Sequence, residues 1–317
     1  MLIGHHGQFD PLLFSEIRAG YPGAEIVPYV DIQEAQRRHE MRAIVTRSGL
    51  SFDAVFFDSA PRLQLVVKAG SGTDNIDHAA AEARGITVMS TGGSERSVAE
   101  LALALMFVCS RHVIQHNSAM RAGDWGSKKQ FVGTNLSEKR LGLIGFGRIG
   151  REAAALARAI GMAVQVYDRS IDKPEKAAAL KALGVVSVSD LKQLMTTSNI
   201  VSLHLPWMPD NAPLLGPKEI AALPDGGIVI NTARAQLVDR AALAEALSTG
   251  RIAAGLDVHY AEGGDGDSDL IALPNVAALP HIGAQTSETH KNIAKRAAQM
   301  VAAHLATEGE SHEACNL

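Results

Sequence analysis

Three ionisable side chains at the ends of apolar runs have types suited to chemistry on a 2-keto acid. His281 follows the run NVAALP, Arg234 lies shortly after GGIVIN, and Asp257 lies near the end of IAAGLDV. Histidine titrates near neutral pH and can give a proton to a keto oxygen or take one back. Arginine binds a carboxylate through two hydrogen bonds. A carboxylate beside the imidazole orients it and favours its charged form, and Asp257 or Glu262 could supply that contact.

A glycine-rich turn is the second chemical feature. The run LGLIGFGRIGRE contains Gly145, Gly147 and Gly150 in the G-x-G-x-x-G pattern, and Asp168 follows eighteen residues after Gly150. Between a strand and a helix, this spacing allows a tight turn, close approach of a pyrophosphate, and close packing of helix on strand. The phosphates would lie at the helix N-terminus. Asp168 would accept hydrogen bonds from the adenosine ribose and repel a 2′-phosphate, which favours NAD over NADP, although the adjacent Arg169 can accommodate that phosphate.

Each feature also has a purely structural interpretation. A lone histidine is usually satisfied by local hydrogen bonds, Arg234 could be a solvated cation, and Asp257 could cap a turn. The chain has 29 glycines, so one glycine pattern is weak by itself. We favour a nucleotide-dependent enzyme because all these features are predicted to lie at one sheet edge. His112 and His116 are four residues apart on a predicted helix, but no third ligand is evident, and we expect no metal site.

The elements that must position these residues form two series of short apolar runs alternating with helical stretches. This alternation is typical of βα units on parallel sheets, where ligands bind beyond the carboxyl ends of the strands. A long helical stretch over 97–121 separates the two series, and a last one covers 286–307. We therefore predict an α/β protein with two Rossmann-like, doubly wound parallel-sheet domains. The expected strands are 25–30, 42–48, 63–70 and 85–90, then 140–146, 162–168, 184–188, 199–205, 226–231, 252–258 and 275–280.

Composition argues against several other classes of protein. The chain has 317 residues and 46% hydrophobic content, enough for two domains, and its net charge of −4 gives no footprint for nucleic acid. The longest apolar run, 101–109, is half the length of a membrane span, and the N-terminus lacks the pattern of a signal peptide. Cys109 and Cys315 are too few for a disulfide framework. We expect a cytoplasmic protein without nucleic-acid or membrane partners.

Several motifs together resemble the D-isomer-specific 2-hydroxyacid dehydrogenase family, which includes phosphoglycerate dehydrogenases and glyoxylate/hydroxypyruvate reductases. The resemblance implies an NAD-dependent oxidoreductase that reduces a small 2-keto acid to the D-2-hydroxy acid, and the reverse. The motifs extend over nearly the whole chain: KAGSGTDNID (68–77), SVAE (97–100), LGLIGFGRIGRE (141–152), NIVSLHLP (199–206), INTARAQLVD (230–239), GLDV (255–258) and LPHIGAQT (279–286).

The resemblance also implies catalytic and cofactor-binding roles. Arg234 would hold the substrate carboxylate and keto oxygen, and His281 would be the general acid in reduction and the general base in oxidation. Glu262 would orient His281, and Asp257 would support Arg234 and the nicotinamide side of the cofactor. The cofactor-binding residues would be Gly145, Gly147, Arg148, Ile149, Gly150, Asp168, His204, Pro206, Thr232, Ala233, Arg234, Asp257, His281 and Gly283.

Substrate binding and domain organisation follow from the same resemblance. Backbone N–H groups around Gly70, Ser71 and Gly72 would form an anion nest for the substrate carboxylate. A flavodoxin-like substrate domain would comprise 1–98 and 285–317, with an NAD-binding domain, 99–284, inserted into it. Two chains would pair as a homodimer through the NAD-binding domain.

Departures from the family pattern leave the substrate open. The run DVHYAEGGDG around Glu262 has His259 and lacks the usual proline, and Arg96 stands where asparagine is frequent. With Arg47 and Lys68, Arg96 makes a phosphorylated substrate conceivable. Glyoxylate, hydroxypyruvate and phosphohydroxypyruvate therefore all remain candidates.

Two other functions are compatible with the same sequence features. One is a non-catalytic NAD(H) sensor that binds protein partners, and it would bind NADH without oxidising it. The other is a relative acting on formate or phosphite, although the formate branch tends to have glutamine where Glu262 stands.

Overall fold

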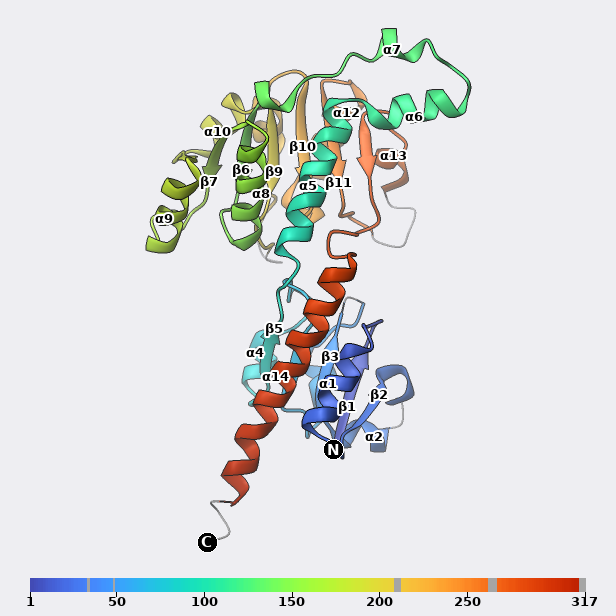
Figure 1. The fold of residues 1–317 in the computed structure, drawn as a ribbon, viewed down its shortest axis with the longest axis vertical. Helices are drawn as coiled ribbons and strands as arrows, with labels where there is room; N and C mark the ends of the chain where they lie inside the picture. Colours follow the sequence, from blue (N-terminus) through green and yellow to red (C-terminus); the bar gives the residue numbers. More distant parts are fainter. Residues whose placement is uncertain (33–34, 48, 208–211, 262–266, 314–317) are drawn as a thin grey trace. The chain divides into compact units, whose positions relative to one another are not determined.

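The structure, a computed structural model, describes residues 1–32, 35–47, 49–207, 212–261 and 267–313. The chain divides into two compact units, which Figure 1 shows as ribbons: unit 1 is Met1–Ser94 with Ala284–Leu317, and unit 2 is Glu95–Gly283. Each unit contains one parallel sheet with helices on both faces, which confirms the predicted fold class. The units separate after residues 94 and 283, whereas the sequence predicts domain boundaries after residues 98 and 284.

Unit 1 has a five-stranded parallel sheet in the order β2-β1-β3-β4-β5, which is the flavodoxin-like order. Helices α1 (Leu12–Gly20) and α14 (Ser287–Glu313) cover one face of this sheet. The 3-10 helix η1 (Tyr29–Ile32), α3 (Ala54–Asp58) and α4 (His78–Glu82) cover the other. The remaining elements are α2 (Ala35–Glu40) and the strands β1 (Leu2–His6), β2 (Glu25–Pro28), β3 (Met41–Thr46), β4 (Leu65–Lys68) and β5 (Thr87–Ser90).

The apolar strands of unit 1 are explained by this two-sided burial. Alternate residues of a strand point to opposite faces, so a sheet covered on both sides needs apolar residues throughout. Val45 and Val67 pack against α1 and α14, whereas Ile44 and Val66 pack against the opposite helix layer.

Unit 2 has a seven-stranded parallel sheet in the order β12-β11-β10-β9-β6-β7-β8. Counted from β6, this is the doubly wound dinucleotide-binding order 3-2-1-4-5-6 with one more strand at the far edge. The direction of winding reverses between β6 and β9, so a ligand site is expected beyond the carboxyl end of β6. The strands are β6 (Arg140–Ile144), β7 (Ala163–Tyr167), β8 (Val186–Ser187), β9 (Ile200–Leu203), β10 (Gly227–Asn231), β11 (Ile252–Leu256) and β12 (Val276–Ala278).

Helices cover both faces of the second sheet as well. One layer contains α5 (Glu95–Ser110), α8 (Arg148–Ala159) and α9 (Pro174–Leu183), and the opposite layer contains α10 (Leu191–Thr197), α11 (Pro217–Ala222) and α12 (Arg240–Ser248). The strands β6 to β12 end at a common edge because all of them run parallel. The other elements are α6 (Val113–Arg121), α7 (Ser127–Gln130), η2 (Leu136–Glu138), η3 (Ala235–Leu237) and α13 (Ser268–Ile271).

The predicted long helix over 97–121 is wrong as a single helix. It is broken between α5 and α6 by His112, whose backbone has φ +50° and ψ +40° in the left-handed region. His112 and His116 therefore do not share one helical face, and both ring nitrogens of His116 lie 3.2 Å from protein partners, Ser127 Oγ and the Phe131 carbonyl. In the part of the chain that is described, no single helix has the length and apolarity to cross a membrane, and α5 and α6 reach that limit only as a pair bent by 64°.

Candidate active site

The glycine-rich turn joins β6 to α8 at the point where the sheet order reverses. Gly145 has φ +96°, a conformation that residues with a side chain rarely adopt. A Cβ atom on Gly150 would overlap the carbonyl oxygen of Gly145, so this glycine lets α8 pack directly against the turn. A Cβ atom on Gly147 would meet nothing within 4 Å, and α8 begins at the next residue. The residues present therefore fit a dinucleotide, because they leave open space before a helix N-terminus.

Asp168 follows β7 beside this turn, and its carboxylate is fully engaged. Oδ2 accepts the N–H of Phe146 at 2.7 Å and the Lys176 ammonium at 2.6 Å. Oδ1 accepts the N–H and the hydroxyl of Ser170 at 2.8 and 2.9 Å. Burial alone would raise the pKa of this carboxyl, but these four hydrogen bonds outweigh it and lower the pKa to about 2. Asp168 is thus ionised at every physiological pH, and it ties the glycine-rich turn to the neighbouring strand end.

Sequence reasoning missed Lys176, although the chain contains a signal for it. Lys176 lies in the first turn of α9, where a cation opposes the helix dipole and an acidic residue is usual. A lysine at that position indicates that some nearby acid compensates for the unfavourable placement.

Two polar side chains at the carboxyl edge of unit 2 each have a buried atom without a hydrogen-bond partner among the described residues, namely His204 Nδ1 and Thr232 Oγ1. Burial lowers the pKa of His204 to about 4, so its imidazole is neutral at physiological pH, and its Nε2 lies 2.9 Å from Ser202 Oγ. Buried polar atoms are normally paired, so these two are further features that fit a bound nucleotide.

The other residues predicted to bind the cofactor lie at the same edge. Ile149 is half-buried in the first turn of α8, and Pro206 is exposed beyond β9. Ala233 is half-buried beyond β10. Arg148 is exposed, and its Nε lies 3.2 Å from Glu95 Oε1 of α5.

The loop that carries Arg234 is shaped by the side chain of Asn231, the last residue of β10. Asn231 Oδ1 accepts the N–H of Ala233 at 3.0 Å, and its Nδ2 donates to the carbonyl of Arg234 at 2.8 Å. The Arg234 guanidinium donates to the Ala233 carbonyl at 2.7 Å. This buried asparagine therefore fixes the backbone from which the guanidinium extends.

His281 lies in a tight turn beyond β12 that the carboxylate of Asp257 holds. The His281 backbone is left-handed, with φ +57°, and its side chain is exposed. Asp257, only 1% exposed at the end of β11, accepts the N–H groups of Ile282 and Gly283, each at 2.8 Å. Burial raises the pKa of Asp257, while the two N–H groups and the nearby His281 and His259 oppose that shift. The two hydrogen bonds that this carboxylate accepts come from the backbone N–H groups of the two residues after His281.

Among the described residues after β11, Asp267 makes contacts that sequence reasoning did not single out. Asp267 is 2% exposed and accepts the N–H of Tyr260 at 2.6 Å and Arg240 Nε at 3.2 Å. His259 Nε2 donates to the carbonyl of Leu279 at 2.8 Å, two residues before His281. No sequence signal separates Asp267 from its acidic neighbours. Glu262, predicted to orient His281, lies outside the described residues.

In unit 1, the predicted carboxylate nest lies in the loop beyond β4. The N–H of Gly70 already donates to Thr91 Oγ1 at 3.0 Å, so it is not free for an anion. The N–H groups of Ser71 and Gly72 have no hydrogen-bond partner in the described part of the chain. Their role as substrate ligands stays a prediction, and it concerns two N–H groups rather than three.

The cations that make a phosphorylated substrate conceivable are largely engaged. Lys68 is buried, and its ammonium donates to the Arg47 carbonyl at 2.9 Å and to Asn75 Oδ1 at 3.0 Å. Arg96 Nε donates to Glu100 Oε1 at 2.6 Å. Arg47 lines a cavity of about 390 Å³ beyond the carboxyl ends of β1 and β3, together with Gln8, Phe9, Asp10, Gln285 and His290.

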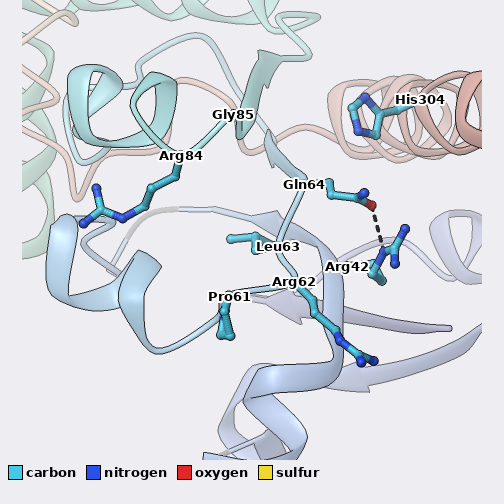
Figure 2. A pocket seen from close by; sticks show the side chains of 8 residues that line it. All are labelled: Arg42, Pro61, Arg62, Leu63, Gln64, Arg84, Gly85 and His304. Carbon is cyan, nitrogen blue, oxygen red and sulfur yellow. Dashed lines mark hydrogen bonds between the residues drawn. The ribbon is translucent and has the colours of Figure 1, made fainter.

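A cavity of about 410 Å³ in unit 1, shown in Figure 2, lies away from these strand ends. Its lining residues Arg42, Gln64 and Gly85 lie at the amino ends of β3, β4 and β5. Figure 2 shows the guanidinium of Arg84 turned away from those of Arg42 and Arg62, and Arg84 pairs with Asp58 at 2.7 Å. Because ligands of parallel sheets bind at the carboxyl ends, this cavity is not the substrate site.

Comparison with known proteins gives consistent results. Residues 103–283 match the family described as "D-isomer specific 2-hydroxyacid dehydrogenase, NAD binding domain". A hydroxypyruvate reductase of Thermotoga maritima is 37% identical over 273 residues, which cover 85% of this chain and 83% of that protein. A D-3-phosphoglycerate dehydrogenase of Archaeoglobus fulgidus is 37% identical over 280 residues, 88% of this chain but only 50% of the relative, so this chain spans about half its length.

This chain is also similar to a solved structure of a reductase. The glyoxylate reductase from Paecilomyes thermophila aligns with a TM-score of 0.84 and 28% identity, over 94% of this chain and 93% of that one.

We expect Gly147→Ala and Gly150→Ala to separate nucleotide binding from stability. The Cβ of Gly150→Ala overlaps the Gly145 carbonyl, and overpacking of this kind lowers the free energy of unfolding by about 1–3 kcal/mol. The Cβ of Gly147→Ala enters open space, so stability should change by less than about 1 kcal/mol. NADH affinity of this variant should fall at least about tenfold. Urea denaturation and NADH fluorescence titration measure the two effects, and unchanged NADH affinity in Gly147→Ala would contradict a pyrophosphate at this turn.

We expect Asp257→Asn to lower the free energy of unfolding by about 1–3 kcal/mol, because the amide nitrogen cannot accept one of the two backbone N–H groups. Asp225→Asn is the matched control, since the Asp225 side chain is 89% exposed and should contribute less than about 1 kcal/mol. Urea denaturation compares the two variants. Equal stability of both would show that Asp257 does not hold the His281 turn.

Proposed function

Because the chain belongs to the D-isomer-specific 2-hydroxyacid dehydrogenase family, we propose that it is an NAD-dependent oxidoreductase that interconverts a small 2-keto acid and its D-2-hydroxy acid. The observation that supports this most is the turn beyond β12, in which Asp257 fixes the backbone next to His281. The loop of Arg234 follows β10, and only β11 separates these two strands in the sheet. An acid–base group and a carboxylate-binding group thus extend from one sheet edge, beside the glycine-rich turn.

The proposed reaction divides the work among residues of this chain. The bound cofactor supplies a hydride to the carbonyl carbon in the reductive direction. Arg234 binds the substrate carboxylate through bidentate, charge-assisted hydrogen bonds, on a backbone that Asn231 holds. His281 donates a proton to the keto oxygen during reduction and removes it from the hydroxyl during oxidation. Glu262 stabilises the charged imidazole in this proposal.

We assign NAD as the preferred cofactor and an unphosphorylated acid as the preferred substrate. Asp168 stays ionised, and a carboxylate there disfavours a 2′-phosphate. Lys68 is buried between two loops and Arg96 is paired with Glu100, so neither is presented for a substrate phosphate. Glyoxylate and hydroxypyruvate therefore rank ahead of phosphohydroxypyruvate. The relatives named as a hydroxypyruvate reductase and a glyoxylate reductase support this ranking, whereas the D-3-phosphoglycerate dehydrogenase of equal identity supports the phosphorylated acid.

We further propose a cytoplasmic homodimer that forms through unit 2. Helix α6 buries none of its residues within the chain, and Figure 1 shows α6 and α7 in a segment that extends away from the sheet of unit 2. The side chains of Trp125 and Val132 are 74% and 77% exposed in this segment. Large apolar side chains exposed together support a protein–protein contact. Four further large apolar residues of α5 and α6 are also exposed, namely Phe107, Val113, Ile114 and Met120.

The activity is tested with His281→Asn and a panel of 2-keto acids that includes glyoxylate, hydroxypyruvate and phosphohydroxypyruvate. We expect the wild type to oxidise NADH with at least one acid, and the variant to lose about 100-fold or more in kcat, the size expected for lost acid catalysis. NADH affinity of the variant should change much less, because the glycine-rich turn is untouched. If the wild type binds NADH but reduces none of the acids, the protein is a sensor rather than this enzyme.

Oligomeric state is tested with a double variant, Trp125→Glu with Val132→Glu. We expect the wild type to sediment at twice the 33.5 kDa mass of one chain and the double variant at 33.5 kDa, because buried unpaired carboxylates destabilise an apolar interface. Val186→Glu introduces one carboxylate at another exposed apolar residue, 64% exposed on β8, and should leave the dimer intact. A wild type that sediments as a monomer would rule the proposal out.

A further inference from the structure

The ion pair between Asp168 and Lys176 lies where the fold places the adenosine ribose of a dinucleotide. Lys176 Nζ lies 2.6 Å from Asp168 Oδ2 and 2.7 Å from Ser170 Oγ. The two charged side chains are only 14% and 12% exposed, so the pair is largely shielded from solvent. An ammonium is thus held inside the region that normally selects between a ribose hydroxyl and a ribose phosphate.

The hydrogen bonds of Asp168 leave little acceptor capacity for a ligand. A carboxylate has about four lone-pair positions, and four donors already occupy them. Two of these donors are backbone N–H groups, of Phe146 and Ser170, whose positions the turn fixes. The other two are the Ser170 hydroxyl and the Lys176 ammonium, which can rotate away. A ribose hydroxyl that binds Asp168 has to displace one of these two side-chain donors.

We propose that Lys176 is a specificity-determining residue that lets this site accept dinucleotides with a 2′-phosphate, so that NADPH can bind in addition to NADH. Lys176 neutralises Asp168 and thereby reduces the repulsion that an unpaired carboxylate exerts on a phosphate. The same ammonium can turn from the carboxylate to a neighbouring phosphate, because both anions suit a lysine donor. This inference rests on the proposed cofactor site, and it reduces the expected preference for NAD without reversing it.

The two cofactors affect the ion pair differently. With NADH, the ribose hydroxyls compete with Lys176 for the carboxylate, and the displaced ammonium gains no new anion. With NADPH, the displaced ammonium gains the 2′-phosphate. Removing the ammonium therefore leaves NADH affinity unchanged or increases it, while it weakens NADPH affinity. This opposite response distinguishes Lys176 from a residue that only stabilises the loop, because structural damage weakens both cofactors together.

The test is fluorescence titration of NADH and NADPH on wild type, Lys176→Met and Lys173→Met, without any keto acid. Lys173→Met is the matched control, because it removes the same charge immediately before α9, and in the described structure the hydrogen bonds of Asp168 come from Phe146, Ser170 and Lys176. We expect Lys176→Met to raise the ratio of the NADPH to the NADH dissociation constant at least about tenfold. Lys173→Met should change this ratio less than about threefold. Thermal unfolding checks that both variants remain folded.

Two outcomes would overturn the inference. One is a ratio in Lys176→Met that equals the ratio in Lys173→Met, and the other is a loss of NADH affinity as large as the loss of NADPH affinity. Asp168→Asn in the Lys176→Met background adds a second measurement, because it removes the repulsion that Lys176 compensates and should restore NADPH affinity at least in part. The assay requires no turnover, so a protein without dehydrogenase activity still gives a clear result. Failure of the proposed activity and failure of this inference are therefore separate.

Discussion

The strand ends of both sheets depend on one constraint: backbone groups that leave a parallel sheet and are buried must find new hydrogen-bond partners. In this chain, short polar side chains at the carboxyl ends of the strands provide them. Asp257 holds the N–H groups beyond β12, Asn231 holds the loop beyond β10, and Asp168 holds the glycine-rich turn beyond β6. In unit 1, the buried Lys68 binds the loop beyond β3 in the same way. Asp257, Asp168 and Lys68 connect their own strands to neighbouring loops, whereas Asn231 holds the loop that follows its own strand.

This arrangement prepares the candidate site for chemistry before any ligand binds. Asn231 holds the backbone of Arg234, and Asp257 from the neighbouring strand holds the backbone after His281, so in the proposed reaction little ordering remains when a substrate binds. Asp257 is nearly inaccessible to solvent, and each of its two oxygens accepts one backbone N–H group. A buried carboxylate satisfied in this way tolerates few substitutions, and even Gly283 is confined, since a Cβ there would lie 3.1 Å from Asp257 Oδ2.

The cofactor end of the site follows the same constraint with a different consequence. Asp168 holds the turn through Phe146, but it also binds the ammonium of Lys176. One carboxylate thus combines a structural role with an electrostatic one, and it is through the electrostatic role that we propose an effect of Lys176 on the choice of dinucleotide. The glycine-rich turn requires a hydrogen-bond acceptor at Asp168 for the N–H of Phe146, whereas the turn itself does not require the ammonium of Lys176.

Much of this was accessible from the sequence alone. Strands and helices alternate with the spacing of βα units, and parallel strands must end at one edge, so the two-domain fold and the common edge of Gly145, Asp168, Arg234 and His281 followed from the pattern. The break at His112 did not follow, because the local sequence SRHVI contains neither glycine nor proline and nothing in it requires a left-handed residue there.

Only the tertiary structure decided which atoms pair. Asp257 binds backbone N–H groups 25 and 26 residues away, Lys68 binds the carbonyl of Arg47, and Lys176 binds Asp168. Asp267 is buried although its neighbours in the sequence are equally acidic. The physical reason is that periodicity reports which face of an element is buried, whereas a hydrogen bond depends on a distance of about 3 Å between loops far apart in the chain. The sequence by itself determined which ionisable side chains lie at the sheet edge. The packing of the loops determined that Asp257, Asn231 and Asp168 hold the backbone there through hydrogen bonds.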